Sequence, residues 1–167
     1  MSSVRSVLFF ALLLSPLSLW AQAKWIWVKD ARLPGAKIEF SQEIHLSSHA
    51  VSARLQAVSD FSSLVLRING QKIGQRSALS PLLALDVSRH LLKGRNFVSI
   101  TTRATGEAPG VALRLDWTDA GGAGSSLFSN ETWKSRDEKG KGRTVESFGS
   151  LSNERWWNLP PLGVDSI

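Results

Sequence analysis

"LVLRINGQKIG", residues 64–74, is the stretch that decides the fold class of this chain. Successive side chains of a strand point to opposite faces, so Leu64, Leu66 and Ile68 form one apolar face. The pair Asn69-Gly70 follows them and tolerates the positive φ angles that a tight hairpin turn requires. The stretch therefore predicts two antiparallel strands that join at residues 69–70 and bury one face.

The same alternation of apolar and polar residues recurs on both sides of this hairpin. It predicts a strand in each of four further stretches, KIEFSQEIHL (37–46), VSARLQA (51–57), NFVSITT (96–102) and VALRLDW (111–117). In the last stretch the apolar row ends at Trp117, while Arg114 and Asp116 lie on the opposite face. We therefore expect Trp117 to belong to the core.

One short helical turn is predicted between two of these strands. Asp86 is placed to cap it, Leu91 and Leu92 are expected to face inward, and Gly94 is expected to end it in a left-handed conformation. Beyond residue 120 the alternation weakens and returns briefly around Trp133, which is also expected to be buried. About seven or eight short strands without a long helical period predict an all-β chain folded as a β-sandwich jelly roll.

The first 23 residues have the features of a secretory signal peptide. Arg5 precedes the apolar run 7–19, and the small-residue triplet AQA at 21–23 provides a cleavage site. A membrane span needs about 20 apolar residues, so a retained membrane anchor is the less favoured alternative. We expect a secreted or periplasmic protein in which residues 24–158 form one domain and residues 159–167 form a C-terminal tail.

Composition narrows the classes of partner. The chain has no cysteine, which excludes a disulfide scaffold and a cysteine-based zinc site. Without residues 1–23, 19 basic and 14 acidic side chains remain, a net charge of +5. The basic residues are spread along the chain, whereas nucleic-acid binding requires a dense basic stripe. We therefore expect no nucleic-acid partner, while attraction to an anionic polysaccharide or an outer surface stays open.

No motif in the sequence predicts catalysis. A glycosidase needs two carboxyl groups about 5 to 10 Å apart, and Asp60, Asp86, Asp116 and Asp119 qualify by residue type alone. The pair His45 and His49 has metal-ligand spacing for a helix, but it lies in a predicted strand and turn. We therefore expect no catalytic residues, no metal site and no cofactor.

Tryptophan is the residue type with two possible roles here, because an indole ring can fill a core or present a flat face to a sugar. Trp25 and Trp27 belong to the stretch WIW, in which Ile26 and Val28 occupy the other face. A strand that is apolar on both faces favours burial, so we interpret WIW as a first core strand and not as a ligand platform. Trp156 and Trp157 are adjacent and point opposite ways, so one of them is expected to be exposed.

Several of these stretches, in this order, resemble a known family. They are WIW after the signal peptide, the Asn69-Gly70 turn with Lys72 and Gly74 beyond it, DVSRHLLKGRNFVSI, GVALRLDW and ETWKS. The chain resembles, over residues 24–158, the galactose-binding-like jelly-roll domain found near the N-terminus of bacterial α-L-rhamnosidases. In those enzymes hydrolysis belongs to a separate helical barrel domain, so the resemblance implies an accessory module and not the hydrolase.

The first functional hypothesis is a secreted, non-catalytic module that binds carbohydrate through loops at one end of the sandwich. Its predicted ligand contacts are Asp60, Arg103 and Trp156, since the first two can hydrogen-bond hydroxyl groups while a tryptophan stacks on a sugar. The alternative is a protein-interaction or structural module of a bacterial envelope assembly. In that case the basic loop 134–143 and the tail LPPLGVDSI at 159–167 would be docking elements.

Overall fold

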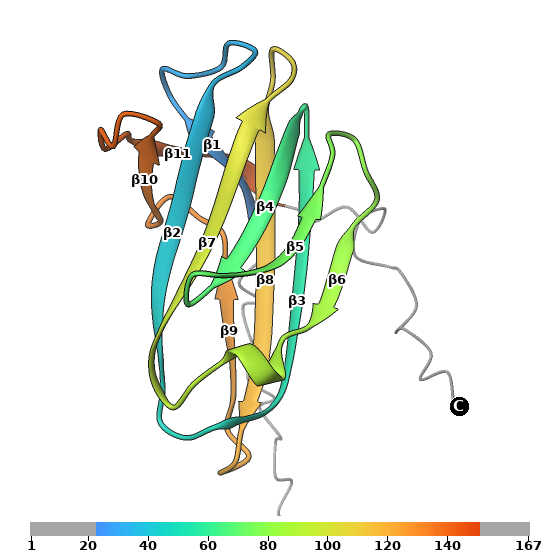
Figure 1. Ribbon diagram of the computed structural model, residues 1–167, viewed down its shortest axis with the longest axis vertical. Helices are drawn as coiled ribbons and strands as arrows, with labels where there is room; N and C mark the ends of the chain where they lie inside the picture. The colour runs from blue at the N-terminus through green and yellow to red at the C-terminus, as the bar shows by residue number, and fades with distance from the viewer. Residues whose placement is uncertain (1–22, 151–167) are drawn as a thin grey trace, which may run out of the picture.

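The computed structural model describes residues 23–150, which form two antiparallel β-sheets packed face to face (Figure 1). The six-stranded sheet has the order β11-β1-β8-β3-β6, and β9 also pairs with β8. The five-stranded sheet has the order β10-β2-β7-β4-β5. The bounds are β1 Lys24–Val28, β2 Lys37–Leu46, β3 Ala50–Asp60, β4 Ser62–Ile68, β5 Gln71–Arg76, β6 Leu83–Asp86, β7 Gly94–Ala104, β8 Gly110–Asp119, β9 Gly124–Phe128, β10 Lys134–Asp137 and β11 Val145–Ser150.

The predicted hairpin is confirmed. β4 and β5 pair antiparallel, and the pair Ile68 and Gln71 closes the ladder next to the turn. The turn residues Asn69 and Gly70 have φ angles of 52° and 80°, the left-handed region that a two-residue hairpin turn uses. The four further predicted strands are confirmed as parts of β2, β3, β7 and β8.

Along the strands apolar and polar side chains alternate, and the apolar ones point between the two sheets, where they form the core. Leu64, Leu66 and Ile68 of β4 are at most 1% exposed, and Leu113 and Leu115 of β8 face them from the other sheet. Burial of each such aliphatic side chain contributes roughly 1.5–3 kcal/mol relative to exposure. The all-β sandwich predicted from the period of two is therefore what the chain forms, with a jelly-roll arrangement of its strands.

Two tryptophans complete this core. Trp27 is fully buried, and its ring centroid lies 5.8 Å from that of Phe40. Its indole N–H donates to the Ala31 carbonyl at 2.7 Å, and that of Trp133 donates to the Phe128 carbonyl at 3.0 Å. Each ring thus satisfies its one polar group while it is buried. The predicted burial of Trp133 is confirmed.

The connection between β6 and β7 differs in part from the prediction. A 3-10 helix, η1, spans Ser88–His90, and Leu91 is buried after it, but Leu92 is 53% exposed. Adjacent residues of an extended segment point opposite ways, so Leu91 and Leu92 do not both face inward. Asp86 lies two residues before η1 and accepts from Ser88 N at 2.9 Å, so it caps the turn from outside the helix.

Two further predictions need correction. Trp117 packs against the main core but is only half-buried, because it lies near the end of β8, so its predicted burial is confirmed in part. Residues 23–150 form eleven strands, more than the predicted seven or eight. β9, β10 and β11 are short and rich in polar residues, so their alternation is weak.

Within residues 23–150 the structure has no helix that is long and apolar enough to cross a bilayer.

Candidate functional site

Three connections lie together at one end of the sandwich (Figure 1). They are the β1–β2 loop, the β3–β4 turn and the β7–β8 loop. In a sandwich, loops at one end of the sheets come from distant parts of the sequence, so side chains of separate segments can surround one ligand. This is the kind of position in which the sequence predicted a binding site.

A cavity of about 310 Å³ opens at this end, beside the outer face of the six-stranded sheet. We call it the end cavity. Its lining comes from β1, the β1–β2 loop, the end of β3, the β7–β8 loop and β11. The residues are Trp25, Arg32, Asp60, Ala108, Pro109, Gly110 and Phe148.

Trp25 forms one apolar wall of the end cavity. It is half-buried and packs against a small cluster outside the main core, formed by Val58, Leu82 and Ala112. Its ring lies close to Gly110, where an added Cβ would be 3.1 Å from Trp25 Cε3. The absence of a side chain at Gly110 therefore lets the indole lie against the backbone of β8.

A bulge in β11 lies beside Trp25. Lys24 pairs with Ser150 and Ile26 with Ser147, so β11 contains one residue more than β1 in this interval. Gly149 has a φ of 116°, which favours glycine. Bulges break the alternation of side chains and often direct a residue toward a site. Trp27 belongs to the main core, whereas Trp25 is half-buried against a second apolar cluster, so the predicted burial is confirmed for Trp27 and only in part for Trp25.

Arg32 and Phe148 form the opposite, amphipathic part of the lining. The Arg32 guanidinium carbon lies 4.8 Å from the centroid of the Phe148 ring, within the range of a cation–π contact. Arg32 Nη2 also lies 3.5 Å from Glu146 Oε2. These two contacts hold the Arg32 guanidinium at the edge of the cavity. A guanidinium has five N–H donors, so several remain for a ligand.

Asp60 supplies the carboxylate of the end cavity, and the turn after it is well fixed. Phe61 has a φ of 43°, uncommon for a residue with a Cβ, and its carbonyl accepts from Thr105 N at 2.8 Å. A Cβ at Gly106 would lie 2.6 Å from Phe61 Cδ1, so the Phe61 ring rests on that glycine. The β3–β4 turn and the β7–β8 loop are thereby joined.

The three sequence-predicted contacts have different positions. Asp60 lines the end cavity. Arg103 is exposed in β7, on the outer face of the five-stranded sheet, and the structure does not bring it to this cavity. Trp156 and the tail 159–167 lie outside the described residues. The roles of Asp60, Arg103 and Trp156 as ligand contacts stay predictions.

Sequence reasoning missed Arg32 and Phe148 as site residues. They are far apart in the chain and meet because β1 and β11 are neighbours in the sheet. A weak signal was present: Phe148 is the one aromatic residue in the otherwise polar stretch ESFGS at 146–150.

The other candidate carboxylates have structural partners. Asp119 accepts from Ser47 Oγ at 2.8 Å and from Gly121 N and Ala123 N, and these bonds, the Ser47 hydroxyl first, lower the pKa of Asp119. Asp86 accepts from the Ser88 hydroxyl and amide, which lower its pKa. In the described part of the chain no three histidine or acidic side chains come together as ligands for a metal ion.

Neither a protein-family model nor a curated protein sequence matches this chain. Solved structures do. The α-L-rhamnosidase of Streptomyces avermitilis in complex with L-rhamnose matches 80% of this chain with a TM-score of 0.69 and 18% identity, over 15% of its own length. A rhamnosidase of Aspergillus terreus matches 81% of this chain at 0.67 and 16% identity, over 22% of its length. The Pleurotus ostreatus lectin matches 80% at 0.66 and 18% identity, over 43% of its length.

These matches define the class of fold. The chain is a jelly-roll β-sandwich of the kind that forms one part of α-L-rhamnosidases and of the Pleurotus lectin, and it spans less than half of each of them. The predicted resemblance to a rhamnosidase accessory domain is confirmed at the level of the fold. A shared fold does not fix a ligand, so function has to come from the site.

Proposed function

We propose that this protein is a secreted, non-catalytic module that binds a saccharide in the end cavity. The observation that carries the proposal is the lining itself, in which two aromatic rings, one guanidinium and one carboxylate surround a single opening. Small-ligand sites are mostly apolar with a few polar groups that set orientation, and the end cavity has this composition.

Each group has a role that suits a sugar. The indole of Trp25 offers a flat face to the C–H face of a pyranose ring, and Phe148 closes the opposite side. The Asp60 carboxylate accepts hydrogen bonds from hydroxyl groups, and the Arg32 guanidinium donates them. A volume of about 310 Å³ lies at the small end of the range for ligand sites, which suits one or two sugar units.

The comparisons support a sugar as the ligand class. One neighbour in fold is a rhamnosidase in complex with L-rhamnose, and another is a lectin in complex with GalNAc. A non-catalytic role is supported by the lining, because Asp60 is the one acidic residue among the described residues of the end cavity and a glycosidase uses two. Secretion is supported by the signal-like residues 1–23.

The test is a screen of the purified protein against a panel of neutral and acidic glycans, followed by calorimetric titration of each hit. Trp25→Ala is expected to weaken a genuine hit by at least about ten-fold, equivalent to about 1.4 kcal/mol, because a stacking face is lost. Asp60→Asn is expected to weaken it by a similar factor because hydroxyl groups lose a charged acceptor. Arg95→Gln, in the first residues of β7 and not in the lining of the end cavity, is the matched control. Equal affinities for all four proteins would refute this assignment.

A protein partner is the second candidate, and one observation favours it. Leu33, Phe61 and Phe148 are 78%, 41% and 46% exposed, and their segments belong to the same end of the sandwich. Exposed apolar side chains grouped in this way can form an interaction surface. Folded protein that binds no glycan of the panel, but forms a stable complex with an envelope protein lost on Leu33→Ser, would favour this function.

A further inference from the structure

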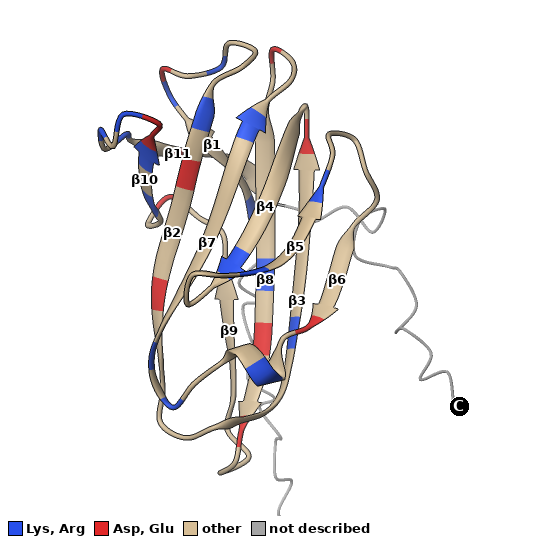
Figure 2. Cartoon of the chain, viewed as in Figure 1, with Lys and Arg blue, Asp and Glu red and all other residues tan. Residues whose placement is uncertain are grey.

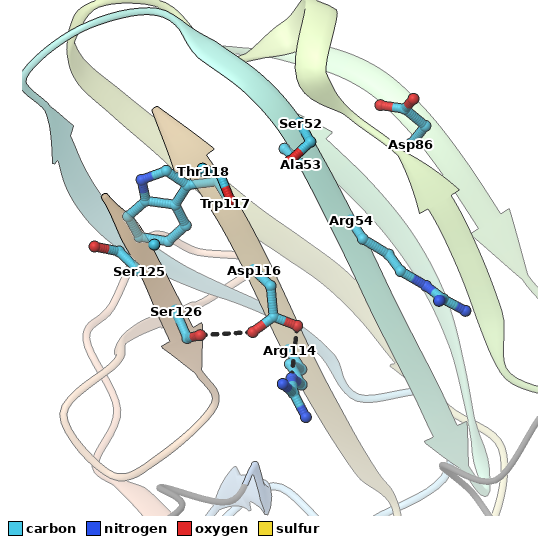
Figure 3. Close-up of a pocket in the computed structure, with 11 residues that line it drawn as sticks. Ser52, Ala53, Arg54, Asp86, Arg114, Asp116, Trp117, Thr118, Ser125 and Ser126 are labelled. Carbon is cyan, nitrogen blue, oxygen red and sulfur yellow. Dashed lines mark hydrogen bonds and ion pairs between the residues drawn. The ribbon is translucent and has the colours of Figure 1, made fainter. Parts of the chain in front are cut away.

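A second hollow, larger than the end cavity, lies on the outer face of the six-stranded sheet (Figure 3). We call it the sheet groove; its volume is about 810 Å³. It runs over β3, β8 and β9 toward the end of β6. It is lined by Ser52, Ala53, Arg54, Asp86, Arg114, Asp116, Trp117, Thr118, Gly124, Ser125 and Ser126.

Arg54 is the central cation of the sheet groove. In the sheet it is paired with Asp86 of β6 on one side and with Asp116 of β8 on the other. Its side chain nevertheless forms no ion pair or hydrogen bond with a described residue, and its Nε atom is buried without a partner. Figure 3 shows the guanidinium directed away from the Asp86 carboxylate. No described residue pairs with the charge of this guanidinium, and Arg54 as a whole is only half-buried, so an acceptor bound in the sheet groove would supply the missing partner.

The two carboxylates beside Arg54 in the sheet pair with other donors. Asp116 accepts from Arg114 Nε at 2.6 Å and from Ser126 Oγ at 2.5 Å (Figure 3). Asp86 accepts from the amide and the hydroxyl of Ser88 through Oδ1. The contacts of these two carboxylates are therefore with Arg114, Ser126 and Ser88 and not with Arg54.

We propose that the sheet groove is a second ligand site, which takes an acidic saccharide and places a sugar carboxylate against the guanidinium of Arg54. A planar carboxylate fits the end of the guanidinium, since its two oxygens can accept from the two terminal Nη groups together. The sheet groove shares β3 and β8 with the end cavity but none of its lining residues, and it does not depend on the function proposed for that cavity.

The remaining lining suits a hydroxylated ligand. Ser52, Thr118 and Ser125 present hydroxyl groups along the sheet groove, and Trp117 is half-buried beside them. The charges of Arg54 and Arg114 are balanced by those of Asp86 and Asp116, so the groove has no excess charge that would attract every anion. Recognition would therefore depend on direct contact with Arg54 and on the hydroxyl groups.

The probe is trigalacturonate, with its methyl ester as the uncharged counterpart, titrated into the isotopically labelled protein and followed by NMR. The acid is expected to shift the Arg54 Nε–H signal and the backbone amides of Ser52 and Ser126. Arg54→Lys keeps the charge but removes the planar edge, and Arg54→Gln removes both. Each is expected to weaken binding at least ten-fold, while Arg95→Gln, which changes an exposed arginine of the other sheet, leaves binding unchanged.

Four outcomes would overturn the proposal. They are equal binding by the wild type and Arg54→Lys, equal binding of the acid and its ester, no shift in these signals from folded protein, and Arg54-dependent binding of galactose 6-sulfate but not of trigalacturonate. The last result would assign the groove to sulfate esters. A loss of binding in Trp25→Ala without an effect of Arg54→Gln would place the uronate in the end cavity instead.

Discussion

At the scale of single residues, Gly110 sets the position of the Trp25 ring. A Cβ at this position would lie 3.1 Å from Trp25 Cε3, closer than ordinary contact, while the backbone of β8 around it is buried. Close-packed neighbours leave the ring little room to move except outward. The end cavity therefore depends on a glycine that itself carries no chemistry.

Gly110→Ala is expected to displace the Trp25 ring and to weaken saccharide binding by roughly three- to ten-fold, with stability within about 1 kcal/mol of the wild type. Calorimetric titration of the strongest glycan hit measures the first effect and urea unfolding the second. Gly142→Ala is the matched control, because its added Cβ would meet nothing closer than 3.8 Å. Unchanged affinity in Gly110→Ala would show that the ring position does not matter.

The sequence predicts some residues of the end cavity better than others. Asp60 could be placed there because it ends an alternating strand next to a turn. The place of the Trp25 ring outside the main core could not be predicted, because the ring lies beside a bulge in β11 and against the empty position at Gly110, which belong to other strands. Arg103 was expected in the loop before the VALRLDW strand, but β7 continues to Ala104, so Arg103 is a strand residue on the outer face of the five-stranded sheet.

At the scale of elements, Asn96 holds the start of β7 to the hairpin turn. It is fully buried, accepts from Leu92 N at 2.8 Å and from Asn69 Nδ2 at 2.9 Å, and donates to the carbonyls of Leu92 and Gly94. Asn69 in turn accepts from Phe97 N at 3.0 Å. Two asparagines thus fix the Asn69-Gly70 turn against the η1–β7 connection.

Asn96→Ala is expected to lower the free energy of unfolding by about 2–4 kcal/mol, because the part-buried backbone groups of Leu92 and Gly94 and the Asn69 amide lose their partner in a fully buried side chain. Urea unfolding at pH 7 measures this change. Gln75→Ala removes an exposed amide of β5 and should stay within about 0.5 kcal/mol of the wild type. A loss in Asn96→Ala no larger than in the control would contradict a structural role for the network.

Element boundaries follow the strength of the alternation. β2 spans the same residues, 37–46, that the pattern predicts, because four apolar residues mark one face over its length. β10, with the sequence KSRD, has no apolar residue and is positioned by its pairing with β2. Local pattern predicts strands that bury a face and misses strands that only extend a sheet.

At the scale of the whole molecule, charge is mixed and not collected into a stripe (Figure 2). Several carboxylates instead accept hydrogen bonds from backbone amides or nearby side chains and so stabilise turns. Asp137 accepts from Lys139 N and Lys141 N and pairs with Arg143 Nη2 at 2.6 Å, and the Arg143 contact is the main reason that its pKa is lowered. Asp86 and Asp119 have lowered pKa values for the reasons given above.

Stability is therefore expected to depend on pH in the acid range. A carboxyl group whose folded pKa lies below its ordinary value of 3.8 stabilises the fold above that pH, and the stabilisation is lost as pH falls through the folded pKa. These groups predict a nearly constant urea midpoint from pH 7 to pH 5 and a fall below about pH 4. Asp119→Ala should lower the midpoint at pH 7 and reduce the fall. A midpoint that rises on acidification would contradict this role.

The number and polarity of the strands predict the jelly-roll class, because a chain that is almost entirely strand must bury one face of each sheet against another. Which strands are neighbours is a property of the whole chain. The β1–β11 pairing that builds half of the end cavity joins residues more than 100 positions apart. Local sequence carries no signal for such a pairing, so the cavity itself could not be predicted.

The most direct test of saccharide binding in the end cavity is to follow the indole N–H signals of the tryptophans by NMR while the strongest glycan hit is added. The proposal predicts that the Trp25 signal shifts and saturates, while those of Trp27 and Trp133, buried in the core, stay in place. A shift at Trp117 with Trp25 unmoved would contradict it and would place the sugar in the sheet groove.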